Sequence, residues 1–178
     1  MYKLQNLIGL PVIDARTGRS AGNVLDVWFD DRWSLAGIVL KARRWWLTTF
    51  YEAVRWEHVQ ACGRDVVLIS GKKAVCRLKS AEIGRAFHTG TIRMKDLPVV
   101  TEEGRQLGRV SDVYFQEKSG TPILGFELTD GFVSDLLEGR KWLKAPGDPV
   151  QVTLGDDAIV VPARCEEELE KIVTETGR

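Results

Sequence analysis

The two halves of the chain repeat one set of short segments in the same order. LPVID at 10–14 recurs as LPVVT at 97–101. GNVLDVWF at 22–29 recurs as GRVSDVYF at 108–115, with five of the eight positions identical. Ordered self-similarity of this kind indicates a duplicated structural unit. The chain has 178 residues, so we expect two small units of roughly 70 residues each.

Each copy has the pattern of short β-strands. The run VLDVWF at 24–29 alternates between two faces and is rich in β-branched and aromatic residues, as strands are. Gly18 and Gly104 stand where a tight hairpin turn needs a positive φ. LAGIVLKA at 35–42 and ILGFELTD at 123–130 predict a third strand, and a closing hairpin follows each. Five or six short strands per copy favour a small barrel, which has no open sheet edge.

The sequence predicts an all-β fold with two tandem small barrels and a short C-terminal helix. We expect the first barrel at 1–70 and the second at 94–162. Between them, residues 71–93 carry scattered charges and glycines, which favours a linker with one short helix. After Pro162 the composition changes to CEEELEKIVTETGR, which predicts an acidic helix over 163–178.

The net charge of zero hides an asymmetry between the halves. Residues 1–89 carry 14 Lys and Arg against 8 Asp and Glu, a net charge of +6, and residues 90–178 carry 11 against 17, a net charge of −6. This balance argues against nucleic-acid binding by the whole chain. It favours either attraction between the halves, within one chain or between two, or a separate partner for each half.

Composition also bears on cellular location. The three cysteines are far apart and odd in number, which indicates a reducing compartment and a cytoplasmic protein. The sequence has no signal-peptide pattern and no apolar run of membrane-spanning length. Peripheral attachment to a membrane stays open.

The ordered motifs resemble the PRC-barrel domain, which is named after the photosynthetic reaction centre H subunit. The resemblance rests on L-P-V, a glycine turn, G-x-V-x-D-V-aromatic-F, a third strand and a closing G-x-D segment, once in each half. The stretch GFVSDLLEGRKWL at 131–143 is further similar to tandem PRC-barrel proteins of spore-forming bacteria. The resemblance implies a small β-barrel used for protein contacts and no shared enzymatic activity.

Motifs of known catalytic sites are missing from the sequence. It contains no GxSxG, HExxH or GxGxxG pattern and no phosphate-binding loop. His58 and Cys62 are too isolated for a zinc site. We expect Asp26 and Asp112, one in each copy, to accept backbone hydrogen bonds at the same barrel corner. The sequence therefore predicts a non-enzymatic protein without a catalytic residue, cofactor, metal or small-molecule substrate.

A basic and aromatic stretch in the first copy is a candidate contact surface. It comprises Lys41, Arg43, Arg44, Trp45, Trp46, Phe50, Tyr51, Arg55 and Trp56, of which the first five are the candidate contact residues. Tryptophan and arginine dominate protein interfaces, and they also suit RNA or an anionic membrane surface. The alternative is that the aromatic rings fill the barrel core while the arginines lie in water.

The second copy has a different segment at this place, SDLLEGR. Ser134, Asp135 and Arg140 are its candidate contact residues, and the alternative is a loop that only closes the barrel. We therefore expect a protein-interaction adaptor or scaffold that binds a protein partner or itself. The alternative function is a ribosome- or RNA-associated assembly factor that uses the basic aromatic stretch.

Overall fold

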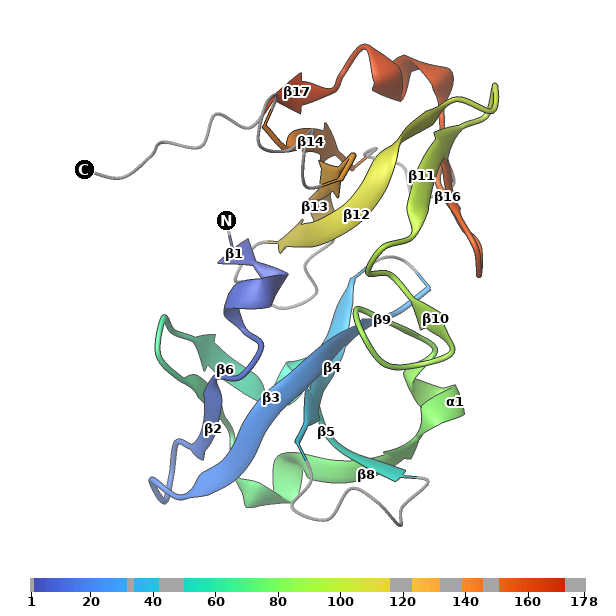
Figure 1. Cartoon of the computed structure of the whole chain (residues 1–178). Coiled ribbons are helices and arrows are strands. Elements are labelled where there is room, and N and C mark those ends of the chain that lie inside the picture. The colour runs from blue at the N-terminus through green and yellow to red at the C-terminus, as the bar shows by residue number, and fades with distance from the viewer. Residues whose placement is uncertain are drawn as a thin grey trace, which may run out of the picture. The chain divides into compact units, whose positions relative to one another are not determined.

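The structure of this protein is a computed structural model that describes residues 2–31, 34–41, 50–115, 123–131, 139–145 and 151–171. The chain forms two compact units, one built mainly from residues 1–94 and one mainly from residue 95 onward. Both units consist mostly of strands in curled sheets, with only short helical turns between them (Figure 1). The predicted all-β fold is confirmed.

The first unit is a curled sheet with the strand order β6-β7-β2-β3-β4-β5-β8; β9 pairs with β3, and β10 pairs with β9. The long strand β3 is the blue arrow at the centre of this unit in Figure 1. The elements of the unit are β1 (Tyr2–Lys3), η1 (Leu4–Asn6), β2 (Pro11–Asp14), β3 (Ser20–Phe29), β4 (Leu35–Leu40), β5 (Phe50–Arg55), η2 (Trp56–His58), β6 (Val59–Cys62), β7 (Val67–Ile69), η3 (Lys72–Ala74), β8 (Val75–Lys79), α1 (Ser80–Ile83), β9 (Arg85–Ala86) and β10 (Ile92–Arg93).

The second unit repeats this topology with the strand order β15-β16-β11-β12-β13-β14-β17. Strands β11 and β16 run parallel to each other, as β2 and β7 do in the first unit. The elements are β11 (Pro98–Thr101), β12 (Gln106–Phe115), β13 (Ile123–Thr129), β14 (Lys141–Lys144), β15 (Thr153–Leu154), β16 (Ile159–Val161), η5 (Ala163–Glu166) and β17 (Glu170–Lys171).

Strand register repeats as well as strand order. Val12 lies opposite Gly22 between β2 and β3, and Val99 lies opposite Gly108 between β11 and β12. The register shifts directly after Val12 and directly after Val99, and both glycines have positive φ, 134° and 149°. A bulge bends a strand at the place where it occurs. Both units therefore curl at the same point of the repeat, which confirms the duplication.

Each unit has a core of small and branched apolar side chains on one sheet face. In the first unit Val12, Val27, Ile38, Val54, Val67 and Ile69 are fully buried. In the second unit the repeat places Val99, Val113, Phe126, Leu143, Ile159 and Val161 at the same positions, and all are buried. The predicted closing hairpins are present as the antiparallel pairs β6–β7 and β15–β16.

The segment 71–93 is part of the first unit, contrary to the linker predicted there. Strand β8 pairs with β5, and β9 pairs with β3. Leu78, Ile83 and Ala86 from this segment pack in one cluster with Trp28 and Val39. Burial of these apolar side chains fixes the segment on the sheet. The charges of the segment lie on its outer face and conceal this inner side in the sequence.

The C-terminal segment also differs from the single helix expected over 163–178. It begins with the 3-10 helix η5, whose Cys165 is buried, and continues as strand β17. Strand β17 pairs with β14, which otherwise would present an open edge on that side. Pairing with this edge favours an extended chain at Glu170 and Lys171. Residues 172–178 lie outside the described part of the chain.

Candidate interaction site

A buried carboxylate lies at the centre of the second unit. Glu127 belongs to β13 and is only 1% exposed. A charge taken out of water is costly unless it is paired and hydrogen-bonded. The surroundings of Glu127 are therefore a candidate site.

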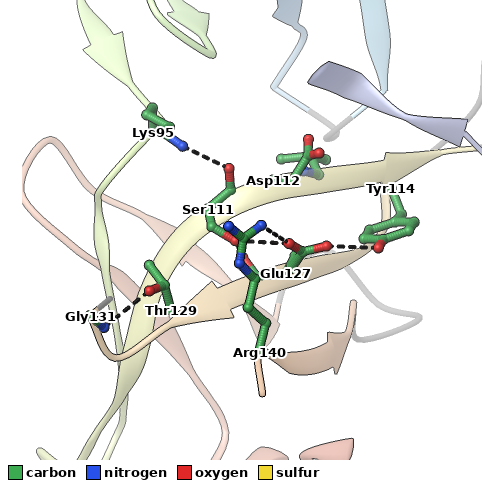
Figure 2. Close-up of polar contacts among 9 residues, drawn as sticks. Lys95, Ser111, Asp112, Tyr114, Glu127, Thr129, Gly131 and Arg140 are labelled. Atoms are coloured by element: carbon green, nitrogen blue, oxygen red, sulfur yellow. Dashed lines mark hydrogen bonds and ion pairs between the residues drawn. The ribbon is translucent and has the colours of Figure 1, made fainter. Parts of the chain in front are cut away.

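Three polar side chains surround Glu127, and all four come from this unit (Figure 2). The Tyr114 hydroxyl donates to Oε2 at 2.8 Å, and Arg140 Nη1 donates to Oε1 at 2.5 Å. Ser111 Oγ lies 3.1 Å from the Glu127 carbonyl oxygen and 3.4 Å from Oε1. We call these four residues the Glu127 cluster. Its hydrogen bonds hold the carboxylate in one orientation inside the sheet.

Arg140 connects this buried cluster to the surface. It follows Gly139, which has a φ of 78°, and directly precedes β14. Its side chain is 51% exposed although the carboxylate that it binds is 1% exposed. Lys141, the next residue, forms an ion pair with Asp130. The two ion pairs together fix the start of β14 against the end of β13.

The first unit builds the same place from apolar side chains. The repeat aligns Gly125 with Gly37 and therefore Glu127 with Val39; strand register places Trp142 opposite Glu127 and Ala53 opposite Val39. The repeat also places Leu25 at the position of Ser111, and Tyr51 at that of Arg140. These three residues belong to, or pack against, the cluster beneath β8, α1 and β9. One topology therefore accommodates either an apolar or a charged cluster.

An indole ring covers a glycine beside both clusters. A Cβ atom added to Gly125 would lie 2.4 Å from Cη2 of Trp142, and one added to Gly37 would lie 2.2 Å from Cη2 of Trp28. Trp142 also meets Tyr114 edge-on, with ring centroids 4.7 Å apart. Such close approach is open only to a residue without a side chain. The Glu127 cluster thus lies on a tightly packed part of the sheet.

The structure describes two of the eight residues predicted from sequence as contact residues. Lys41 is exposed directly after β4, and its backbone N–H donates to the Asn23 carbonyl at 2.8 Å. Arg140 belongs to the Glu127 cluster. The other six lie outside the described residues, namely Arg43, Arg44, Trp45, Trp46, Ser134 and Asp135.

Sequence reasoning missed the other members of the cluster. In the sequence, Ser111, Tyr114 and Glu127 show only the pattern of strand residues. The available signal was the alignment of ILGFELTD with LAGIVLKA, in which Glu127 replaces Val39 in the middle of a buried strand. A charge at a position that the other copy fills with valine marks a place where the two copies differ in chemistry.

The duplicated aspartates accept backbone hydrogen bonds, as predicted. Asp26 Oδ1 accepts from the Val27 N–H at 2.8 Å, and Oδ2 accepts from the N–H groups of His88 at 2.8 Å and Thr89 at 2.5 Å. Asp112 Oδ1 accepts from the Val113 N–H at 2.8 Å. Asp26 ties β3 to the loop after β9, which gives it a structural role.

Among the described residues, no group of three or more His, Cys, Asp or Glu side chains is placed to hold a metal ion. No helix in the described ranges has the length and apolar character to cross a membrane. Cys62, Cys76 and Cys165 form no disulfide bond with one another. Burial raises the pKa of the Cys165 thiol, and the nearby Glu168 charge acts in the same direction.

Comparison with known proteins agrees with the repeated topology. The family model of the PRC-barrel domain matches this chain twice, at residues 1–75 and 93–167. The chain is also similar to the uncharacterized protein YrrD of Bacillus subtilis (strain 168). The two are 26% identical over 148 residues, which cover 81% of this chain and 79% of the relative. Both matches extend over the two units.

Proposed function

Because this chain belongs to the PRC-barrel domain family, we propose that it is a non-enzymatic adaptor that binds a protein partner, with Arg140 at the contact surface. The observation that carries the proposal is the Glu127–Arg140 pair. It occupies a place that the first unit fills with Val39 and Tyr51. The first unit forms the same topology without such a pair, which supports a role for the pair beyond folding.

Energetics support a role in recognition. Replacing a buried ion pair by apolar side chains of similar volume is often neutral or stabilising, whereas breaking it by removing one partner costs about 3–5 kcal/mol. The second unit keeps a buried ion pair at a position where the first unit folds with apolar side chains. At this position its core is not simply apolar. Departures of this kind occur at functional sites.

The geometry of Arg140 suits a contact residue. Glu127 holds the guanidinium group from the buried side, while half of the Arg140 side chain faces solvent. A side chain that is already held loses less conformational entropy when a partner binds. Arginine is also among the residues that contribute most to protein interfaces. The geometry of Arg140 therefore supports a protein as the binding partner.

A cytoplasmic location belongs to the same proposal. The lack of a disulfide bond among Cys62, Cys76 and Cys165 supports a reducing compartment. Fractionation of native cells, with antibody detection of the protein in soluble, membrane and extracellular fractions, tests it. Recovery from the extracellular fraction would contradict the proposal.

The test of the adaptor function is affinity capture from native cell extract treated with nuclease. We expect Arg140→Ala to reduce recovery of the partner at least about tenfold, the size of an interface hot spot of about 1.4 kcal/mol or more. Arg109→Ala is the matched control, because Arg109 is an exposed arginine of the same unit whose Nη1 donates to the Asp96 carbonyl at 2.9 Å. This control should recover the partner normally.

A second variant separates recognition from stability, since Arg140→Ala leaves Glu127 buried without its arginine. The triple variant Tyr114→Phe, Glu127→Val and Arg140→Tyr converts the cluster toward its apolar counterpart in the first unit. We expect it to melt no lower than the natural chain and still to lose the partner. Retention of the partner by this variant would refute the proposal. Loss of all capture upon nuclease treatment would instead support the RNA-associated alternative.

A further inference from the structure

The same corner of the two units carries opposite charge. In the first unit this corner is the turn between β2 and β3 together with η3. We call its exposed cations the basic corner, and they are Arg16, Arg19, Lys72 and Lys73. In the second unit the corner is the turn between β11 and β12 together with η5 and the residues after it. We call its anions the acidic corner, and they are Glu102, Glu103, Glu166, Glu167 and Glu168.

Backbone contacts show that the corners are equivalent. The Ala15 N–H donates to the Ile69 carbonyl at 3.0 Å, and the Glu102 N–H donates to the Val161 carbonyl at 2.9 Å. Ile69 and Val161 end the equivalent strands β7 and β16. Each turn is thus joined to the helical turn that follows its unit's last hairpin. The two corners therefore share one backbone arrangement and differ in charge.

The basic corner is held in a fixed shape. Asp14 is buried, and its two carboxylate oxygens accept from the backbone N–H groups of Arg16 and Lys72, each at 2.9 Å. The Arg16 guanidinium lies over Gly71, where its Nη2 is 2.9 Å from the place that a Cβ would take. These contacts bring the turn and η3 together before any partner arrives. The cations therefore form a prearranged patch.

The cations of this patch have no ion-pair partner inside the described part of the chain. The acidic corner differs, because Arg105 pairs with Glu166 at 2.6 Å and Arg164 approaches Glu168 at 3.9 Å. Even after these pairs, Glu102, Glu103 and Glu167 remain exposed. The two corners are therefore complementary in net charge.

We propose that the basic corner of one copy binds the acidic corner of a second copy, so that the chain self-associates head to tail. The occupant is identified by charge complementarity, since each copy supplies both patches at matching positions. Such a contact is heterologous and leaves one corner of each end copy open. It is separate from the Arg140 surface of the proposed adaptor function.

The first test is the salt dependence of self-association. Charges at a protein surface are screened within about 10 Å at 0.1 M salt and within about 3 Å at 1 M. In analytical ultracentrifugation of the nuclease-treated full chain, we expect oligomers at about 50 mM NaCl and at least tenfold weaker association at about 500 mM. Sedimentation as a monomer at both salt concentrations would overturn the proposal. So would association that requires added nucleic acid.

The second test reverses charge on each corner. Lys72→Glu with Lys73→Glu should abolish self-association, and Glu103→Lys with Glu167→Lys should do the same. An equimolar mixture of the two variants should associate again. The first variant keeps the natural acidic corner and the second keeps the natural basic corner, and the two altered corners are opposite in charge. Failure of the mixture to associate would overturn the proposal.

Two controls make the result specific. Arg64→Glu with Lys79→Glu changes the net charge equally, but Arg64 lies in the β6–β7 turn and Lys79 at the far end of β8. This control should self-associate like the natural chain, and equal loss would mean that only total charge matters. Arg140→Ala should also self-associate normally, so failure of the adaptor proposal and failure of this one are distinguishable.

Discussion

Trp28 and Trp142 place their indole rings over equivalent glycines from different strands. Trp28 of β3 covers Gly37, and Trp142 of β14 covers Gly125. The residue that matches Trp28 in the second unit is Tyr114, and strand register matches Trp142 with Ala53. Each unit thus places an indole over the equivalent glycine, although the two copies supply it from different positions.

This exchange predicts strong coupling between positions 28 and 53. Ala53→Trp alone should crowd the indole already present and cost about 1–3 kcal/mol of unfolding free energy. Adding Trp28→Tyr reproduces the arrangement of the second unit and should recover most of that loss. Urea denaturation of the four proteins in the double-mutant cycle measures the coupling, which we expect to exceed about 0.5 kcal/mol. Simple addition of the two single effects would contradict the prediction.

The covered glycines should tolerate no side chain. In Gly125→Ala the new Cβ would meet Trp142 Cη2 at 2.4 Å and the Leu143 carbonyl oxygen at 2.5 Å. We expect a loss of about 1–3 kcal/mol or more, because backbone must move. Gly104→Ala is the control, since its Cβ would meet nothing within 4 Å and only its positive φ opposes the change. A smaller loss for Gly125→Ala than for Gly104→Ala in thermal or chemical unfolding would count against the packing described here.

Asp26 should be among the most sensitive polar residues of the first unit. Asp26→Ala removes the acceptor of the Val27, His88 and Thr89 N–H groups in a fully buried place. Buried donors left without an acceptor cost about 1–3 kcal/mol each, so we expect a loss of at least about 2 kcal/mol. Asp65→Ala, in the exposed β6–β7 turn, is the control and should change stability by less than about 0.5 kcal/mol. Equal stability of the two variants would refute the assignment.

Asp14 should make folding sensitive to acid. The Arg16 N–H bond lowers the pKa of the Asp14 carboxyl in the folded state, and the Lys72 N–H bond adds to this effect against the opposing effect of burial. A depressed folded pKa contributes stability that is complete above the unfolded value of about 3.9 and is lost as the pH falls through the lower folded value.

Chemical unfolding at several pH values measures this effect. The unfolding free energy of the natural chain should fall more steeply below about pH 4 than that of Asp14→Asn, which carries no carboxyl to titrate. At neutral pH Asp14→Asn should be the less stable protein, because an amide offers one acceptor oxygen where two N–H groups need acceptors. Asp65→Asn serves as the control for a lost surface charge. Parallel acid profiles for Asp14→Asn and the natural chain would disprove the role of Asp14.

The repeat made the strand framework predictable from sequence. Paired motifs at 22–29 and 108–115 specify long strands with a bulge at the same glycine, and the hairpin turns follow from glycine positions. Local patterns of this kind depend on backbone sterics and alternation of side chains, which a single sequence displays.

Contacts between distant strands were less predictable. Segment 71–93 carries so many charges that its few inward apolar residues, such as Leu78 and Ile83, form no clear period. The Glu127 cluster joins residues from three separate segments, and only strand register shows that they meet. The SDLLEGR segment predicts Arg140 as a contact residue, but nothing in that segment indicates the buried carboxylate that Arg140 binds.

Because β8 and β9 pair with the first sheet, the folded first unit is longer than the duplicated segment. The duplicated motifs of the first copy end near residue 70, whereas its folded body continues to Met94. A gene fragment cut at the motif boundary would lose Leu78, Ile83 and Ala86, and Trp28 and Val39 would face water. The boundary of the duplicated segment and the boundary of the folded unit thus lie at different residues. A fragment that keeps the first unit intact has to extend to Met94.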